Sequence, residues 1–119
     1  MTANQAKTVF CDIDGTLLKH LGNLSEQMSE EIPILPKTLE KLNEWNRNGY
    51  YIILITGRKE SMREITIKQL EKSKIFYDKL IMGLPRGQRV LINDSKPDME
   101  STALAFTIQR NKGIGEIDI

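Results

Sequence analysis

Short apolar runs without alternation divide the chain at intervals and predict buried strands. The clearest is 50–55, which consists of YYIILI. The predicted strands lie at 7–12, 50–55, 76–82 and 89–93. The segment 102–110 predicts a fifth strand, or a short helix that leads into one. Apolar runs without polar alternation are typical of parallel strands that are covered on both faces.

Between the first three strands, apolar residues recur at helical spacing instead. The segment 36–48 carries an apolar stripe that includes Trp45, and Gly49 after it is a suitable C-terminal cap. The segment 59–73 predicts a second helix, with opposite charges four residues apart. Strands that alternate with helices predict an α/β fold with a mostly parallel central sheet. We expect one domain over 1–119.

Composition and charge narrow the class of protein. The chain has 119 residues and a formal net charge of +1, so no global basic field favours nucleic acid as a partner. No apolar stretch approaches the roughly 20 residues that span a bilayer, and the N-terminus lacks the layout of a signal peptide. We therefore expect a cytoplasmic protein that does not bind membranes. The single Cys11 excludes an intrachain disulfide.

Polar residues follow three of the predicted strands, where ligands bind in parallel sheets. Asp12 and Asp14 follow the first strand, Thr56 and Gly57 the second, and Asp94 the fourth. Three carboxylates there would suit Mg²⁺, which would also relieve the repulsion between the first two. The threonine hydroxyl, the glycine and the free N–H groups at the following helix start suit a phosphate. Beside a cation, one aspartate can attack phosphorus while another exchanges the proton.

Three motifs, in this order, resemble motifs I, II and IV of the haloacid dehalogenase (HAD) superfamily, in its phosphatase branch. They are DIDGT at 12–16, ITGR at 55–58 and INDSKPD at 92–98, and the resemblance extends from residue 8 to residue 98. It implies a three-layer Rossmann-like domain with a mostly parallel central sheet. It also implies a magnesium-dependent phosphomonoester hydrolase that works through an aspartyl-phosphate intermediate.

The resemblance assigns a role to each motif residue. Asp12 would be the nucleophile and Asp14 the general acid/base, while Thr56 and Gly57 would bind the transferring phosphoryl group. Mg²⁺ would be held by Asp12, by the main-chain carbonyl of Asp14, and by Asp94. An aspartate in the place of Asp14 marks phosphatases and phosphotransferases within the superfamily.

One expected residue is missing. Members usually carry a lysine between the third and fourth strands, where this chain has Leu84 before Pro85. Arg86 is the first candidate for a substitute cation that binds phosphate, and Lys96 is the second. An arginine does not simply replace a lysine at such a site, because its planar guanidinium binds with a different geometry.

The chain is short for the superfamily and resembles its capless members. The segment 17–35 has room for a flap but not for a cap domain. The capless members that this chain resembles either act on macromolecules or close the site with a partner subunit. A homo-oligomer that covers the open site therefore fits this chain. Some similar short proteins belong to surface-polysaccharide pathways, which favours a small phosphate ester such as a sugar phosphate.

Several alternatives stay open. Asp12 and Asp14 could be turn residues, and Thr56 could be an ordinary helix N-cap. The missing lysine allows a regulatory module that binds phosphate and metal with little turnover. An open site also allows a nucleic-acid end phosphatase, although the small net charge makes nucleic acid an unfavoured partner.

Overall fold

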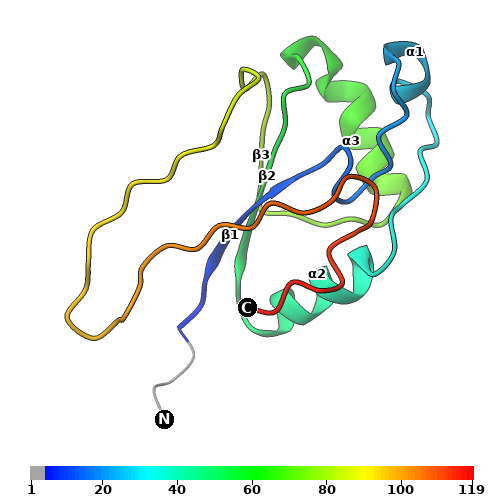
Figure 1. Ribbon diagram of the computed structural model, residues 1–119. Helices are drawn as coiled ribbons and strands as arrows, with labels where there is room; N and C mark the ends of the chain where they lie inside the picture. Colours follow the sequence, from blue (N-terminus) through cyan, green and yellow to red (C-terminus); the bar gives the residue numbers. More distant parts are fainter. Residues whose placement is uncertain (1–4) are drawn as a thin grey trace.

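The computed structural model describes residues 5–119 and has the expected α/β architecture (Figure 1). Its three strands are β1 (Thr8–Asp12), β2 (Tyr51–Ile55) and β3 (Lys79–Ile81). They form one sheet in the order β1-β2-β3, and both neighbouring pairs are parallel. The register aligns Asp12 with Ile55, and Ile55 with Ile81. The carboxyl ends of the strands therefore meet at one edge, where the sequence predicts the site.

The helical segments connect consecutive strands. They are α1 (Leu24–Gln27), α2 (Thr38–Arg47), the 3₁₀ turn η1 (Glu60–Met62) and α3 (Arg63–Lys72). The predicted helix at 36–48 begins at Thr38 because Lys37 has a left-handed backbone, with φ of 67°. The predicted helix at 59–73 is divided between η1 and α3. The predicted alternation of strands and helices is confirmed as far as β3.

The apolar core lies against one face of the sheet. Side chains point alternately to the two faces of a strand, so one set from each strand meets the helices. The buried residues of this interface include Cys11, Ile52, Leu54, Leu42, Trp45 and Leu70. On the other face, Phe10 and Tyr51 stay exposed. Burying one large apolar side chain contributes roughly 1.5–3 kcal/mol, so this core fixes the strand ends that carry the site.

The chain after β3 differs from the sequence prediction. The expected strands at 89–93 and 102–110 do not form, and 83–107 instead make an extended arm that leaves the sheet and returns past β1 (Figure 1). Ile92 in this arm is 91% exposed. The seven residues 82–88 are fewer than the dozen or more that a parallel crossover usually needs. An apolar run alone was therefore insufficient to predict a fourth strand.

The arm also lengthens the molecule. The radius of gyration is 15.0 Å, compared with about 13.5 Å for a compact chain of this length. Within the arm, the hydroxyl of Thr102 donates to the main-chain carbonyl of Asp94 at 2.7 Å, and the amide of Asn93 donates to the carbonyl of Thr102 at 3.0 Å. These local bonds connect the two limbs of the arm.

The predicted flap, 17–35, contains only the four-residue α1, so residues 5–119 include no separate cap domain. Its two ends are joined by main-chain hydrogen bonds from Lys19 to Pro33 and from Leu35 to Leu17, each 2.9 Å long. Within residues 5–119, the helices are too short or too polar to cross a membrane.

Candidate active site

The loop after β1 is closed by a tight set of main-chain bonds. The carbonyl of Ile13 accepts N–H groups from Thr16, Leu17 and Leu18, and the side chain of Ile13 is fully buried. Gly15 has φ of +84°, a conformation that costs glycine little. A Cβ atom on Gly15 would also lie 3.1 Å from Cγ of Arg110. The DG pair thus makes the turn that holds both aspartates at the end of the strand.

Asp12 keeps contact with solvent, yet its carboxyl group loses much of its hydration. Desolvation raises the pKa of Asp12 above its ordinary value, and the neighbouring Asp14 charge adds to the rise. The N–H of Ile13, the positive charge of Arg89 and the hydroxyl of Thr16 act in the opposite direction. A poorly hydrated carboxylate beside a turn is a suitable nucleophile when a cation lies close by.

Asp14 is held by a fork of hydrogen bonds from Arg58. Nε of Arg58 donates to Oδ2 of Asp14 at 2.8 Å, and Nη2 donates to Oδ1 at 2.7 Å. The Arg58 side chain is only 3% exposed, and its Nη1 donates to Thr66 at 2.9 Å and to Gln69 at 2.6 Å. A guanidinium suits this place because its donors are planar and always charged. The pair fixes the orientation of the Asp14 carboxyl group.

Thr56 and Gly57 lie between β2 and η1, beside the end of β3. The hydroxyl of Thr56 is buried and accepts the N–H of Arg58 at 3.1 Å, which leaves its own hydrogen free to donate. A Cβ atom on Gly57 would lie 3.3 Å from the carbonyl oxygen of Leu84. The helical segment expected at 59–73 begins at Glu60, within one residue of the expected start. These residues thus form a loop at the strand ends, before the helix.

Three other predicted residues lie in the arm and are not gathered with the aspartates of β1. Asp94 and Lys96 pair with each other at 3.5 Å, with the Asp94 side chain 82% exposed. Arg86 is exposed in the same segment. Among residues 5–119, no cluster of three or more His, Cys, Asp or Glu side chains could hold a metal ion. As arranged here, the expected Mg²⁺ ligand set is incomplete.

The structure adds residues that the sequence did not single out. Arg89 is close enough to Asp12 to lower the pKa of its carboxyl group, and its Nη1 donates to the carbonyls of Pro85 and Gly87. Asn111 exchanges hydrogen bonds with the main chain of His20, at 2.8 and 3.1 Å, and donates its own N–H to Gly15 at 2.9 Å. None of the three motifs contains these residues, so no motif signalled them.

Two glutamines complete the surroundings of Asp14. Gln27 in α1 donates to Oδ1 of Asp14 at 2.8 Å, and Gln69 in α3 accepts the bond from Arg58. Both side chains are buried. The only sequence signal for these two glutamines is a polar residue in an amphipathic segment. That pattern is too common to identify a site residue. Cys11 is also buried, which raises the pKa of its thiol to about 12 and makes it unreactive.

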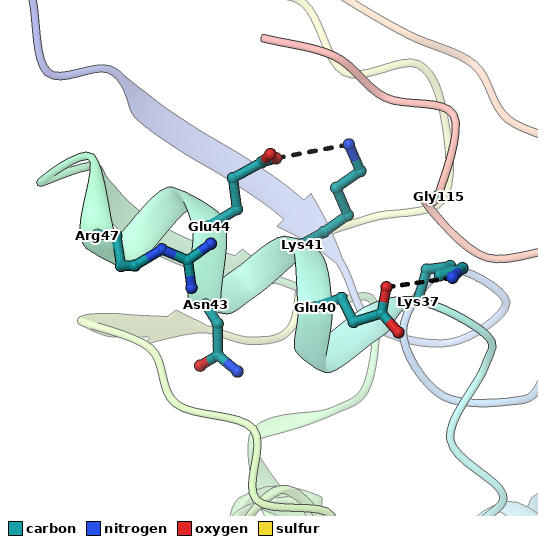
Figure 2. A pocket seen from close by; sticks show the side chains of 7 residues that line it. All are labelled: Lys37, Glu40, Lys41, Asn43, Glu44, Arg47 and Gly115. Carbon is teal, nitrogen blue, oxygen red and sulfur yellow. Dashed lines mark hydrogen bonds and ion pairs between the residues drawn. The ribbon is translucent and has the colours of Figure 1, made fainter.

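A cleft of about 550 Å³ opens beside Asp14, between the flap and η1. Its polar lining includes Asp14, Gln27, Arg58 and Lys59, and Met28 and Met62 supply apolar surface. A second hollow of similar volume lies on α2 (Figure 2). Four of its charged side chains form two ion pairs, Lys37 with Glu40 at 3.2 Å and Lys41 with Glu44 at 3.5 Å. None of its lining residues is predicted for the site or for phosphate binding. Only the first cleft therefore fits the chemistry that the sequence predicts.

Comparison with solved structures supports the same fold. Two structures, described as "Structure of Pnkp1/Rnl/Hen1 complex" and "Structure of the Pnkp1/Rnl/Hen1 RNA repair complex", each match at 32% identity and a TM-score of 0.58. They cover 71% and 73% of this chain, which spans only 30% of each matched chain. A crystal structure of a Vibrio cholerae protein shares the fold at 24% identity and a TM-score of 0.53, covering 74% of this chain and 79% of its own.

Comparison with families gives the classification. No curated protein matches the chain. The family described as "HAD superfamily, subfamily IIIB (Acid phosphatase)" matches residues 1–103, which include all three motifs and the cleft. Members are phosphoric monoester hydrolases, and HAD enzymes typically use a divalent metal ion. The chain therefore belongs to the HAD superfamily, subfamily IIIB.

Proposed function

We propose that the chain hydrolyses a phosphomonoester through an aspartyl-phosphate on Asp12. One observation carries the proposal: Asp12 and Asp14 follow the same strand, and a buried Arg58 fixes the second carboxyl group beside the Thr56 loop. If Asp12 and Asp14 were only turn residues, nothing would require the buried guanidinium of Arg58 or the buried Thr56 hydroxyl with its free hydrogen. Membership of a phosphatase family supports the same reaction.

The steps follow from the chemistry of the two carboxyl groups. Oδ of Asp12 attacks phosphorus, and the bond from phosphorus to the leaving oxygen breaks on the opposite side. Asp14 gives its proton to the leaving oxygen, and then takes one from a water molecule that attacks the phosphorylated Asp12. Phosphate leaves and the Asp12 carboxylate returns. Thr56 and the main-chain N–H groups around Gly57 bind the non-reacting phosphate oxygens.

Arg89 is the cation that we assign to the nucleophile. It lies near enough to Asp12 to stabilise the carboxylate form, and two carbonyl bonds hold its guanidinium in place. Arg86 and Lys96 remain predictions for this role. Arg86 is exposed in the arm, and Lys96 pairs there with Asp94. A positive charge at this place would offset the charge that develops on the phosphoryl oxygens.

Mg²⁺ is the metal ion that we propose, with Asp12, the main-chain carbonyl of Asp14 and Asp94 as its ligands. The first two lie at the end of β1, and oxygen ligands of this kind suit Mg²⁺. Asp94 can join them only if the arm approaches the site, so this assignment stays a prediction. The ion would supply charge neutralisation for the phosphoryl group.

For the substrate, a small ester such as a sugar phosphate is our first candidate. The cleft beside Asp14 has a volume of about 550 Å³, enough for a leaving group of that size. A nucleic-acid end is the second candidate, because two similar structures belong to an RNA repair complex. Arg58 and Arg63 contribute little to a basic groove for nucleic acid, because Arg58 pairs with Asp14 and Arg63 pairs with Glu60. A cytoplasmic location and an oligomer that covers the site stay predictions.

Hydrolysis of an aryl phosphate tests the proposal, with and without millimolar Mg²⁺, for wild type and Asp12→Asn. Turnover that depends on Mg²⁺ and disappears in Asp12→Asn is the expected result. Sugar phosphates and oligonucleotides with terminal phosphates, compared at equal concentration, would then separate the two substrate classes. No turnover in wild type, with phosphate still bound, would favour the regulatory module instead.

A further inference from the structure

The flap and the acid/base carboxyl group are connected by a closed ring of hydrogen bonds. Asp14 accepts from Arg58, which donates to Oε1 of Gln69 at 2.6 Å. Nε2 of Gln69 donates to the main-chain carbonyl of Gln27 at 2.8 Å, and Nε2 of Gln27 donates to Asp14 at 2.8 Å. Four side chains from the β1 loop, the β2 loop, α3 and α1 therefore hold one another in place.

Both glutamine amides have only one orientation that satisfies their partners. In Gln27, Nε2 donates to Asp14 and to the carbonyl of Lys19, while Oε1 accepts the N–H of Leu21 at 2.7 Å. In Gln69, Nε2 donates to two flap carbonyls and Oε1 accepts from Arg58. Exchanging the oxygen and nitrogen of either amide would place donor against donor or acceptor against acceptor. The ring is thus specified by chemistry as well as by distance.

The flap has little else to hold its tip. A helix of four residues, such as α1, is too short to be stable alone. Its Leu24 is 65% exposed, so apolar packing contributes little there. The polar ring therefore controls where α1 lies, and α1 in turn supplies one of the three bonds to the Asp14 carboxyl group.

We propose that Gln27 is a positioning residue, which orients Asp14 for proton transfer only when the flap is closed over the cleft. This inference rests on the proposed phosphatase reaction. Oδ1 of Asp14 accepts two bonds and Oδ2 accepts one, so Oδ2 has a lone pair free to carry the proton. As the bond between phosphorus and the leaving oxygen breaks, that oxygen takes the bonding electrons and then the proton from Oδ2. The hydrogen bond from Gln27 engages Oδ1 and leaves Oδ2 of Asp14 available to the leaving oxygen.

The leaving group provides a specific test. Gln27→Met keeps the length of the side chain and removes its amide, while Glu26→Gln on the same helix is the matched control. An alkyl phosphate needs a proton on its leaving oxygen, whereas 4-nitrophenyl phosphate gives a stable anion and needs little help. Loss of the hydrogen bond to Asp14 is expected to lower kcat/KM, which reports the steps through loss of the leaving group, on the order of tenfold or more for the alkyl ester. The aryl ester should lose less than about threefold.

Equal losses of kcat/KM on both esters, or no loss on either, would overturn the positioning role. Gln27→Asn, whose amide is one methylene too short for Asp14, should reproduce the selective loss if Gln27→Met folds poorly. Circular dichroism establishes the folding of each variant. Glu26→Gln should leave both rates unchanged, because its side chain makes no contact with the ring.

Proteolysis within the flap tests the coupling without any activity. We expect Asp14→Ala, which removes both carboxyl oxygens, and Gln27→Met each to speed cleavage within 17–35 severalfold. Because both changes remove the bond between Gln27 and Asp14, the effect of the double variant should be smaller than the product of the two single effects. Effects that multiply in the double variant would contradict the coupling. If wild type hydrolyses no phosphate ester, the proposed function fails while this measurement still decides whether Gln27 acts on Asp14.

Discussion

The two sides of the candidate site are built in opposite ways. On the flap side, all three guanidinium nitrogens of Arg58 donate hydrogen bonds, and Asp14, Gln27 and Gln69 are held between four elements. On the arm side, Asp94 faces solvent, and Lys96 is its one ionic partner among residues 5–119. One side holds the proposed proton-transfer group in a fixed arrangement, while the other carries its predicted residues on an extended segment.

The difference shows which interactions a site can rely on. A buried charge must be paired, so Arg58 and Asp14 restrict each other to one arrangement. An exposed pair such as Lys96 with Asp94 restricts neither partner, because water competes for both charges. The flap side therefore holds the Asp14 carboxyl group in one orientation, whereas in the proposed mechanism any adaptation to a metal ion or substrate would come from the arm.

The largest effect should come from the nucleophile. Asp12→Asn is expected to reduce phosphatase turnover about 10⁴-fold or more, because an amide side chain cannot form the aspartyl-phosphate. Asp94→Asn tests the arm in the same assay. If the arm approaches the site, this variant should lose about 10²-fold and regain part of the rate at high Mg²⁺. A wild-type rate in Asp94→Asn would show that Asp94 takes no part in catalysis.

Removing the buried guanidinium should cause the largest loss of stability. Arg58→Met leaves Asp14, Thr66 and Gln69 without their donor, and we expect the free energy of unfolding to fall by about 3–5 kcal/mol. Lys96→Met is the matched change in the arm and should cost less than about 0.5 kcal/mol. Urea denaturation of the two variants measures both. Similar losses would contradict the contrast between the two sides.

Apolar residues should show the same contrast. Leu54→Ala removes a fully buried side chain from β2 and is expected to cost about 2–5 kcal/mol. Ile92→Ala in the arm should cost less than about 0.5 kcal/mol, since that side chain is 91% exposed. Thermal or urea unfolding distinguishes the two. A loss for Ile92→Ala as large as that for Leu54→Ala would mean that the arm packs against the protein in solution.

The sequence predicted what depends on short-range patterns. The first three strands, the two helices between them and the positions of Asp12, Asp14 and Thr56 at the strand ends follow from apolar periodicity and from turn residues, and the structure contains them. The partners of Asp14 could not be predicted, because Gln27 and Gln69 are 42 residues apart and meet only through the tertiary fold. The arm was mispredicted because the apolar composition of 89–93 does not reveal whether the connection before it can place a fourth strand.

The smallest predicted effect concerns the charge of Asp12 itself. Desolvation raises the pKa of Asp12, so the folded state binds that proton more tightly than the unfolded state does. The free energy of unfolding should therefore fall as the pH rises from the ordinary value of 3.8 through the raised pKa. Asp12→Asn has no such charge and should be more stable than wild type at pH 7, by less than about 1 kcal/mol because the side chain reaches solvent. Urea denaturation should show this gain at pH 7 and little difference near pH 3. A less stable Asp12→Asn at pH 7 would mean that the fold stabilises the carboxylate, and that the nucleophile is held by attraction to its surroundings more than it is destabilised by loss of water.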